Sequence, residues 1–278
     1  MTDYLKDTWD LQDKELVSVI DEVTLWSASF GLFLLDFVPL KKNMNVLDVA
    51  CGPGFPLLEM AQRLGPTCSV TGIDIWEEGI ELSNKKIKVK KVRNARAIHY
   101  DGITIPFEND SFDLIVSNLG INNFENPEVV CKECFRVTKP GGVFALTTNP
   151  VGHMKEFYDV FEKTLQELDL TSHLTDLEKN IAHRLTYRIV SNMLEKCGFT
   201  IERSLTKDYT IRFTDGSAML NDYFMKIGFM EGWKNVVTPM DEERLFETLE
   251  ANLNAHAGEK GGLTLTVPML YVEAVKSA

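Results

Sequence analysis

The chain has 278 residues, 44% of them hydrophobic, and carries a formal net charge of −12 at pH 7 with a pI near 5.0. This length and composition suffice for one large domain, or for one domain with a smaller companion, and they exclude a disordered chain. The negative charge argues against nucleic acid as the main partner, so we expect a small molecule instead.

Neither a secretory signal nor a membrane span is recognisable, since the apolar segment 30–40 is too short and too interrupted to cross a bilayer. We therefore expect a soluble, cytoplasmic protein. The five cysteines are odd in number and do not suggest a disulfide framework. Cys131 and Cys134 form a C-x-x-C pair inside a helical pattern without a second pair at zinc spacing, so we predict packing there and no metal site.

Residues 1–43 form an N-terminal segment with amphipathic, helical character. Aromatic side chains gather in it at Trp26, Phe30 and Phe33. Two interpretations stay open: a helix packed on the edge of the domain, or a lid over the pocket with Trp26 and Phe30 near the ligand.

Strand and helix patterns alternate over residues 44–150. We predict strands at 45–49, 69–74, 97–100, 112–117 and 143–148, with helices near 56–64, 77–92 and 126–138. This alternation is typical of a doubly wound, mainly parallel α/β sheet with helices on both faces. Such sheets bind ligands beyond the carboxyl ends of their strands.

The first of these strands runs through Asp48 and Ala50 into a turn with Gly52 and Gly54, and a helical pattern follows. Glycine lets a ligand approach the backbone closely, and the first amides of a helix have no partner within it. The turn is therefore suited to an anionic or polar group of a cofactor.

Polar residues also follow the next three strands. Asp74 lies 20 residues after Gly54, a position from which a carboxylate can bind ribose hydroxyls, although Asp74 is also a plausible helix cap. Asp101 and Gly102 can read an adenine edge. Asn118 and Asn122 can orient a substrate, although turn formation explains asparagine equally well. His99 is expected to be a strand residue without a binding role.

Four motifs taken together resemble the class I S-adenosylmethionine-dependent methyltransferases, in particular the small-molecule enzymes similar to ubiquinone/menaquinone-biosynthesis methyltransferases. They are the run 46–54, the acid Asp74, the stretch from Asp101 to Asp113, and the stretch 133–142. The resemblance implies a seven-stranded Rossmann-like sheet with an antiparallel last strand, S-adenosylmethionine as cofactor and S-adenosylhomocysteine as product.

The resemblance also implies roles for individual residues. Asp48 would support the glycine turn and the methionine amino group, Gly52 and Gly54 would pass under the methionine, Asp74 would hold the ribose, and Asp101 with Gly102 would read the adenine. Ala50, Ile75 and Asn118 complete the predicted cofactor site. The chain departs from the family pattern at Pro56, which we expect to stiffen the loop.

The remainder of the chain is predicted as a helical cap insertion (151–190) and the C-terminal part of the sheet (191–278), with a helical insertion at 215–257. Within the C-terminal part we predict a strand pair at 199–205 and 208–213 and a helix over 218–233. Substrate choice should reside in the cap. Candidate bases or orienting groups are His153, His183, His256 and Tyr187, and Tyr158 and Tyr223 are candidate substrate contacts. The aromatic content of 215–257 is also compatible with a homodimer surface.

Methyl transfer to a small-molecule acceptor by in-line displacement is the function that this pattern predicts. One alternative is a non-catalytic or repurposed S-adenosylmethionine-binding protein, because the motifs report binding and not turnover. A less favoured alternative is an NAD-dependent oxidoreductase. It is less favoured because the loop lacks the third glycine that dinucleotide-binding loops have.

Overall fold

The computed structural model describes residues 2–20, 25–182 and 184–277, which divide into two compact units. The core unit comprises residues 11–149, 185–207 and 269–278. The cap unit comprises residues 1–10, 150–184 and 208–268. The four-part division predicted from the sequence stays a prediction.

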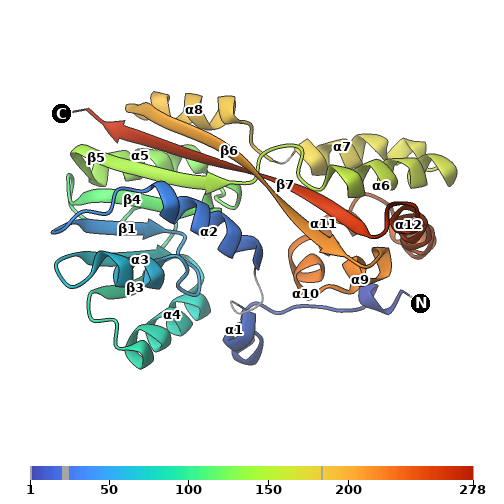
Figure 1. Cartoon of the computed structure of the whole chain (residues 1–278), viewed down its shortest axis with the longest axis horizontal. Helices are drawn as coiled ribbons and strands as arrows, with labels where there is room; N and C mark the ends of the chain where they lie inside the picture. The colour runs from blue at the N-terminus through green and yellow to red at the C-terminus, as the bar shows by residue number, and fades with distance from the viewer. Residues whose placement is uncertain (1, 21–24, 183, 278) are drawn as a thin grey trace. The chain divides into compact units, whose positions relative to one another are not determined.

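A seven-stranded sheet organises the fold (Figure 1). Its strands are β1 (Asn45–Val49), β2 (Ser69–Asp74), β3 (Ala95–His99), β4 (Phe112–Asn118), β5 (Thr138–Thr148), β6 (Phe199–Phe213) and β7 (Leu263–Lys276). The order is β3-β2-β1-β4-β5-β7-β6. Strands β1 to β5 pair in parallel and β7 pairs antiparallel to β5, with Val143 opposite Val275. The predicted fold class is thereby confirmed.

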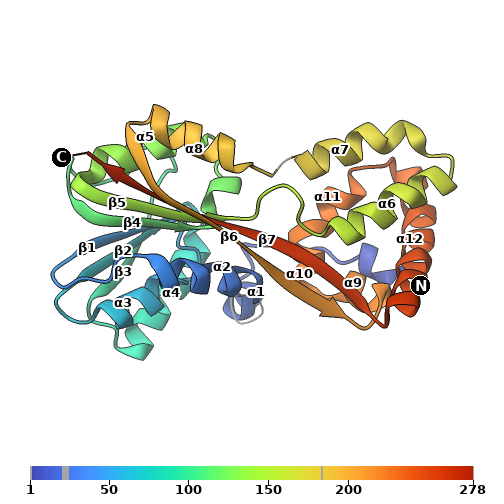
Figure 2. The same cartoon turned by 45° about the horizontal axis from the view of Figure 1, so that its top comes forward.

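Helices cover both faces of the sheet in the core unit (Figure 2). One face carries α5 (Pro127–Val137) and α8 (Tyr187–Lys196), and the other carries α2 (Leu25–Phe37), α3 (Leu57–Leu64) and α4 (Glu77–Lys90). The short α1 (Lys14–Ile20) lies against α4. Helix α3 buries every apolar residue of its 3.6-residue pattern and ends at Gly65, whose φ of 73° continues no helix.

The cap unit is mainly helical. It contains α6 (Lys155–Glu167), α7 (Leu174–Ala182), α9 (Gly216–Asn221), α10 (Tyr223–Met225), a π-helical turn (Lys226–Met230), α11 (Glu231–Lys234) and α12 (Pro239–Lys260). Phe157, Phe161, Trp233 and Phe246 are fully enclosed and form its interior. Since α12 starts with Pro239, proline occupies the helix position where its missing N–H costs least.

Strands β3 and β5 differ from their predicted bounds of 97–100 and 143–148. Two elements of the C-terminal part also differ from the sequence-based expectation. The strand pair predicted at 199–205 and 208–213 is the single strand β6, because nothing in Thr206-Lys207 forces a turn. The helix predicted over 218–233 is broken at Asp222, whose carboxylate accepts a hydrogen bond from the Met225 amide (3.0 Å) and starts a new helix there.

In the described part of the chain, no helix is both long enough and apolar enough to span a membrane.

Candidate functional site

A cavity of about 810 Å³ opens in the core unit at the carboxyl ends of β1, β2 and β4. Strands β1 and β4 are neighbours here although they are not consecutive in the sequence, so the cavity lies where the topology switches direction. Seven predicted cofactor residues line it: Ala50, Gly52, Asp74, Ile75, Asp101, Gly102 and Asn118.

Residues 50–56 form the glycine loop at the cavity, and glycine allows the positive φ that this loop needs. The amides of Ala50 and Cys51 both donate to the Ile73 carbonyl (2.9 and 3.1 Å), which ties the loop to β2. Gly52 has a φ of +48°, and a Cβ there would meet nothing within 4 Å. The backbone of Gly52 is therefore open to an approaching ligand.

At Gly54, unlike Gly52, there is no space for a side chain. Its φ is +107°, and a Cβ would lie 2.4 Å from Leu58 Cδ1 and 2.9 Å from Ser83 Oγ. A side chain at Gly54 is thus excluded by packing as well as by backbone conformation. Pro56, the residue that departs from the family pattern, immediately precedes the first turn of α3.

Asp74 links this loop to the end of β2. Its Oδ2 accepts from the Gly52 amide (2.7 Å) and its Oδ1 from the Trp76 amide (2.9 Å). Burial raises the pKa of the Asp74 carboxyl, and these amide hydrogen bonds offset part of the shift. Trp76, not Asp74, is the residue that precedes α4 as its N-cap. Each carboxylate oxygen keeps acceptor capacity for a ligand hydroxyl.

Asp48 lies on β1, completely buried. Neither carboxyl oxygen has a hydrogen-bond partner of ordinary geometry among the described residues. Burial raises the pKa of Asp48 to about 8, the nearby Asp74 adds to the shift, and the Leu57 amide lowers it in part. Asp48 is thus a buried acid that holds its proton near neutral pH in this structure.

Asp101 and Gly102 lie in a turn after β3. Asp101 Oδ1 accepts from the amides of Ile103 (2.9 Å) and Thr104 (3.0 Å), and these hydrogen bonds lower the pKa of the carboxyl. Gly102 has a φ of +78°. The side chains of Ile75 (61% exposed) and Ile103 (64% exposed) are open apolar surface beside this turn. They are suited to the two faces of a planar ring.

An ion pair on α5 braces the loop that follows this turn. Arg136 donates two hydrogen bonds to the Glu133 carboxylate, from Nε to Oε1 (2.8 Å) and from an Nη to Oε2 (2.7 Å). Glu133 accepts from the Ile105 amide (2.9 Å), while Arg136 donates to the carbonyls of Ile105 (2.9 Å) and Phe107 (2.8 Å). The 133–142 motif therefore holds the loop next to the Asp101 turn in place.

Asn118 and Asn122 are both fixed by neighbours. Asn118 Oδ1 accepts from the Thr147 hydroxyl (2.7 Å), and Nδ2 donates to the Ser27 carbonyl (3.1 Å), which joins β4 and β5 to α2. Asn122 Nδ2 donates to Asn149 Oδ1 (2.5 Å). Asn118 lines the cavity, whereas Asn122 is not among its lining residues.

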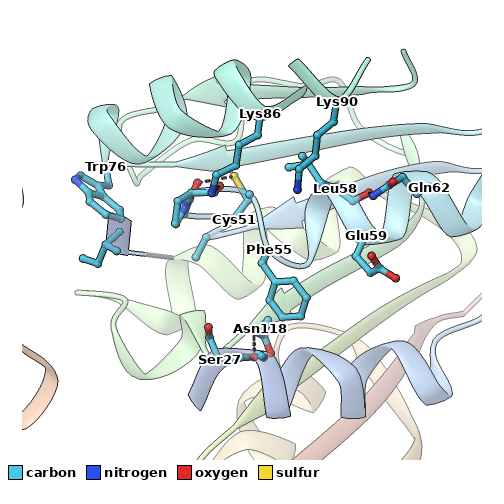
Figure 3. Close-up of a pocket in the computed structure, with 16 residues that line it drawn as sticks. Ser27, Cys51, Phe55, Leu58, Glu59, Gln62, Trp76, Lys86, Lys90 and Asn118 are labelled. Carbon is cyan, nitrogen blue, oxygen red and sulfur yellow. Dashed lines mark hydrogen bonds between the residues drawn. The ribbon is translucent and has the colours of Figure 1, made fainter. Parts of the chain in front are cut away.

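A second cavity, of about 400 Å³, adjoins the other side of the glycine loop (Figure 3). It shares Ala50, Gly52 and Asn118 with the first and includes Gly54. In Figure 3, Lys86 and Lys90 extend from α4 toward it, and Phe55 points toward α2. Lys86 Nζ donates to the Pro53 carbonyl (2.9 Å), so this lysine also supports the loop.

The remaining predicted residues lie elsewhere. Trp26 and Phe30 of α2 are buried (6% and 0% exposed), and the lid role stays a prediction. His153, Tyr158, Tyr223 and His256 belong to the cap unit, and Tyr187 begins α8 of the core unit. His183 lies outside the described residues. His99 has a ring nitrogen 3.0 Å from the Ile75 carbonyl oxygen.

The stretch after β4, which was expected at the pocket, contributes Leu119, Gly120 and Phe124 to the lining. Sequence reasoning missed other lining residues, namely Tyr100, Ile103 and Val129. Leu119 has a φ of 63°, unusual for leucine, and donates its amide to the Thr147 carbonyl (2.9 Å). For Tyr100 the available signal was its place directly after β3, since strand ends are where such sheets bind ligands.

Potential metal ligands do not cluster: among the described residues, no group of three or more His, Cys, Asp or Glu could hold a metal ion. Cys131 and Cys134 are buried within α5.

The first cavity fits S-adenosylmethionine in its chemistry. Asp74 offers acceptors for ribose hydroxyls, the apolar pair Ile75 and Ile103 flanks a turn suited to adenine, and the open backbone at Gly52 admits the methionine part. Asp48, which precedes the glycine loop on β1, is not among the residues that line either cavity. The specific contacts of each residue stay predictions.

Comparison with known families gives an independent finding. The family model described as "Methyltransferase domain" matches residues 40–222 of this chain.

Individual relatives agree with the family match. Over 106 residues the chain is 36% identical to a demethylmenaquinone methyltransferase of Listeria welshimeri. The aligned residues make up 38% of this chain and 45% of that relative. The chain thus matches less than half the length of that protein. Two solved structures share the fold: a protein from Bacillus halodurans C-125 (TM-score 0.59, 20% identity, 90% of this chain and 100% of that chain) and a SAM-dependent methyltransferase from Aquifex aeolicus (TM-score 0.54, 18% identity, 71% and 93%).

Proposed function

The chain belongs to the family of class I S-adenosylmethionine-dependent methyltransferase domains, and from this membership we propose that it transfers a methyl group from S-adenosylmethionine to a small-molecule acceptor. The observation that carries the proposal is the convergence of Asp74, the Asp101–Gly102 turn and the glycine loop on one cavity. A cytoplasmic location is part of the same proposal.

Binding is divided among elements that the fold holds rigidly. Asp74 connects β2 to the glycine loop, and the Glu133–Arg136 pair fixes the loop beyond Asp101. When bound, the cofactor supplies an electrophilic methyl group on a sulfonium. Because a positive charge disappears in the transfer, the protein's main contributions are alignment of the reacting atoms and exclusion of water.

No base is assigned to the reaction. His153 is 1% exposed, and burial, with a further contribution from the Arg184 charge, lowers its pKa to about 3, so its neutral ring is a weak base. Tyr187 is 44% exposed on α8. A thiol, an amine or an already ionised acceptor needs no strong base.

Calorimetry and product analysis test the proposal. We expect S-adenosylhomocysteine to bind at one site per chain and NADH not to bind. Incubation with methyl-labelled S-adenosylmethionine and a metabolite extract should give S-adenosylhomocysteine above a protein-free background. Binding without such product would favour a repurposed cofactor-binding protein, and preferential NADH binding would overturn the proposal.

A further inference from the structure

The amino-terminal ends of β1, β2 and β3 form a surface of the core unit that the cofactor site does not use. These strands are neighbours and run parallel, with Asn45 of β1 opposite Ser69 of β2 and Val70 of β2 opposite Ala95 of β3. The segments that precede the three strands therefore lie side by side. They lie at the end of the sheet opposite to the cavity, which opens at the carboxyl ends.

Hydrogen bonds join these three segments into one surface. The Cys68 thiol donates to the Lys41 carbonyl (3.2 Å), which ties the segment before β1 to the segment before β2. Asn94 Nδ2 donates to the Gly65 carbonyl (2.8 Å), which ties the segment before β3 to the same place. Helix α4 ends here at Lys91, whose φ is 55°. The side chains on this surface thus project from a backbone that is fixed in position.

Exposed cations gather on the segments before β1 and β3 and on the last turn of α4. They are Lys41, Lys42, Lys88, Lys91 and Arg93. Within the part of the chain that the structure describes, none of the five forms an ion pair, whereas Lys139 of the same unit is paired with Asp113 (2.8 Å). The acid nearest to them in the sequence, Asp36, is also exposed, and the segment 65–68 between them carries no charge.

This concentration of positive charge is opposite in sign to the net charge of the chain, which is −12. Neighbouring strands are about 4.8 Å apart, so the segments before β1 and β3 are separated by about 10 Å, which is close to the screening length in 0.1 M salt. The fields of the five cations therefore add. A helix dipole favours lysine in the last turn of α4, but it gives no reason for Lys41 and Lys42 before β1.

Apolar side chains are exposed among these cations. Leu40 (46% exposed) directly precedes Lys41, and Val89 (71% exposed) directly follows Lys88. Lysine beside exposed aliphatic side chains is typical of segments that bind at a membrane surface, because the cations attract anionic headgroups and the aliphatic groups enter the interface. A nucleic-acid surface would instead offer aromatic rings for base stacking, and neither the five cations nor these two residues include one.

We call the five cations, together with Leu40 and Val89, the amino-end patch. We propose that the amino-end patch binds the surface of an anionic lipid bilayer, so that the carboxyl ends of β1 and β2, where the cavity opens, are directed away from the lipid. No residue of the patch lines that cavity, so this inference does not depend on the proposed function.

Vesicle flotation with the full chain tests the proposal. At about 0.1 M NaCl the protein should bind phosphatidylcholine vesicles in which roughly one lipid in three is phosphatidylserine, and not vesicles of phosphatidylcholine alone. About 0.5 M NaCl should release it by screening. Each cation at an anionic surface strengthens binding roughly five-fold, so the double variants Lys41→Gln/Lys42→Gln and Lys91→Gln/Arg93→Gln should each bind at least about ten-fold more weakly. Val89→Ser should bind roughly three- to ten-fold more weakly at either salt concentration.

The double variant Lys132→Gln/Arg188→Gln is the matched control. It removes the same charge from exposed positions on α5 and α8, which cover one face of the sheet and lie outside the patch, and should bind as the native protein does. Equal binding to the two kinds of vesicle, no binding to either, or equal weakening in the control and the patch variants would each overturn the proposal. Tighter binding of a DNA duplex or of polyglutamate than of the anionic vesicles would also overturn it, by showing a different kind of partner.

Cofactor titration on the vesicles tests the orientation and separates this inference from the proposed function. S-adenosylhomocysteine should bind vesicle-bound and free protein with equal affinity, because the cavity lies at the other end of the sheet. Loss of affinity on the vesicles would show that lipid covers the cavity and would overturn the orientation. Protein that binds anionic vesicles but no S-adenosylhomocysteine would refute the proposed function and support the patch.

Discussion

At the scale of single residues, the site is governed by two acids with different surroundings: Asp48 is completely buried and Asp74 is half-buried. Asp74 is partnered by the amides of Gly52 and Trp76, whereas Asp48 is fully enclosed without comparable partners. Hydrogen bonding to a carboxylate favours its charged form and burial disfavours it. The two acids therefore have separate tasks, Asp74 as an acceptor and Asp48 as an internal acid.

Asp74→Ala should weaken binding of S-adenosylhomocysteine by about 1.5–3 kcal/mol, the scale for hydrogen bonds to a charged group. Calorimetry measures this directly. Glu77→Ala, which removes an exposed acid at the start of α4, is the control and should bind normally. Equal affinity in both variants would remove Asp74 from the binding site.

The raised pKa of Asp48 predicts how the free energy of unfolding varies with pH. Its pKa of about 8 in the folded state exceeds its ordinary value of 3.8, so the folded protein holds a proton that the unfolded chain releases. Stability from this group is full below about pH 4 and is lost as pH rises toward 8. Between pH 5 and 8.5 the native protein should lose unfolding free energy relative to Asp48→Asn, on the order of a few kcal/mol. Urea titrations at several pH values check this, and parallel profiles would contradict it.

Gly54→Ala should destabilise the fold, because the added methyl group meets Leu58 Cδ1 at 2.4 Å and Ser83 Oγ at 2.9 Å. We expect a loss of about 2–4 kcal/mol from strain and overpacking together. Gly141→Ala is the matched control: its φ is +74°, but no atom lies within 4 Å. It should lose about 1–2 kcal/mol from backbone strain alone. Similar melting temperatures in the two variants would refute the packing argument.

At the scale of elements, the sequence predicted the strands whose ends are determined by residues close by in the sequence. β1 and β2 match their predicted bounds because the glycine turn, which the backbone enters at Ala50 with a φ of 65°, ends β1, and the acid Asp74 ends the apolar run of β2. The roles of Glu133 and Arg136 were not predictable, since they lie on α5 but act on a loop about 30 residues earlier.

The brace between α5 and the 105–107 loop gives a prediction of its own. Arg136→Lys should weaken binding of S-adenosylhomocysteine about three- to ten-fold, because lysine cannot reproduce the planar fork that holds Glu133 and the Ile105 and Phe107 carbonyls. The control is Arg63→Lys, in an exposed pair with Glu59 on α3. Calorimetry on both variants measures the affinity for S-adenosylhomocysteine. Equal affinities would show that cofactor binding does not depend on the contacts of Arg136 with the 105–107 loop.

At the scale of the whole molecule, the N-terminal residues belong to two units. Residues 1–10 are part of the cap unit, where the Tyr4 hydroxyl donates to a Glu250 carboxylate oxygen (3.0 Å). Helix α2 is part of the core unit, where Phe30 and Leu34 are fully buried. Truncations at different points should therefore have different consequences.

Deleting residues 1–10 should lower the melting temperature and leave S-adenosylhomocysteine binding intact. Deleting residues 1–36 should give insoluble protein, because it strips buried apolar side chains from the sheet, each worth about 1.5–3 kcal/mol. Solubility, calorimetry and thermal melting of the two truncated proteins test this. A soluble 37–278 chain that binds cofactor but does not turn it over would instead support the lid interpretation of α2.

The path of β7 through the molecule has a consequence for biosynthesis. Residues 263–268 complete the cap unit and residues 269–276 complete the sheet beside β5. A ribosome must therefore translate the chain through residue 276 before either unit can close. Until then β5 presents an open edge, which invites pairing with other nascent chains. Folding of both units must therefore wait for β7, and the yield of folded protein in cells should depend on chaperones that shield that edge.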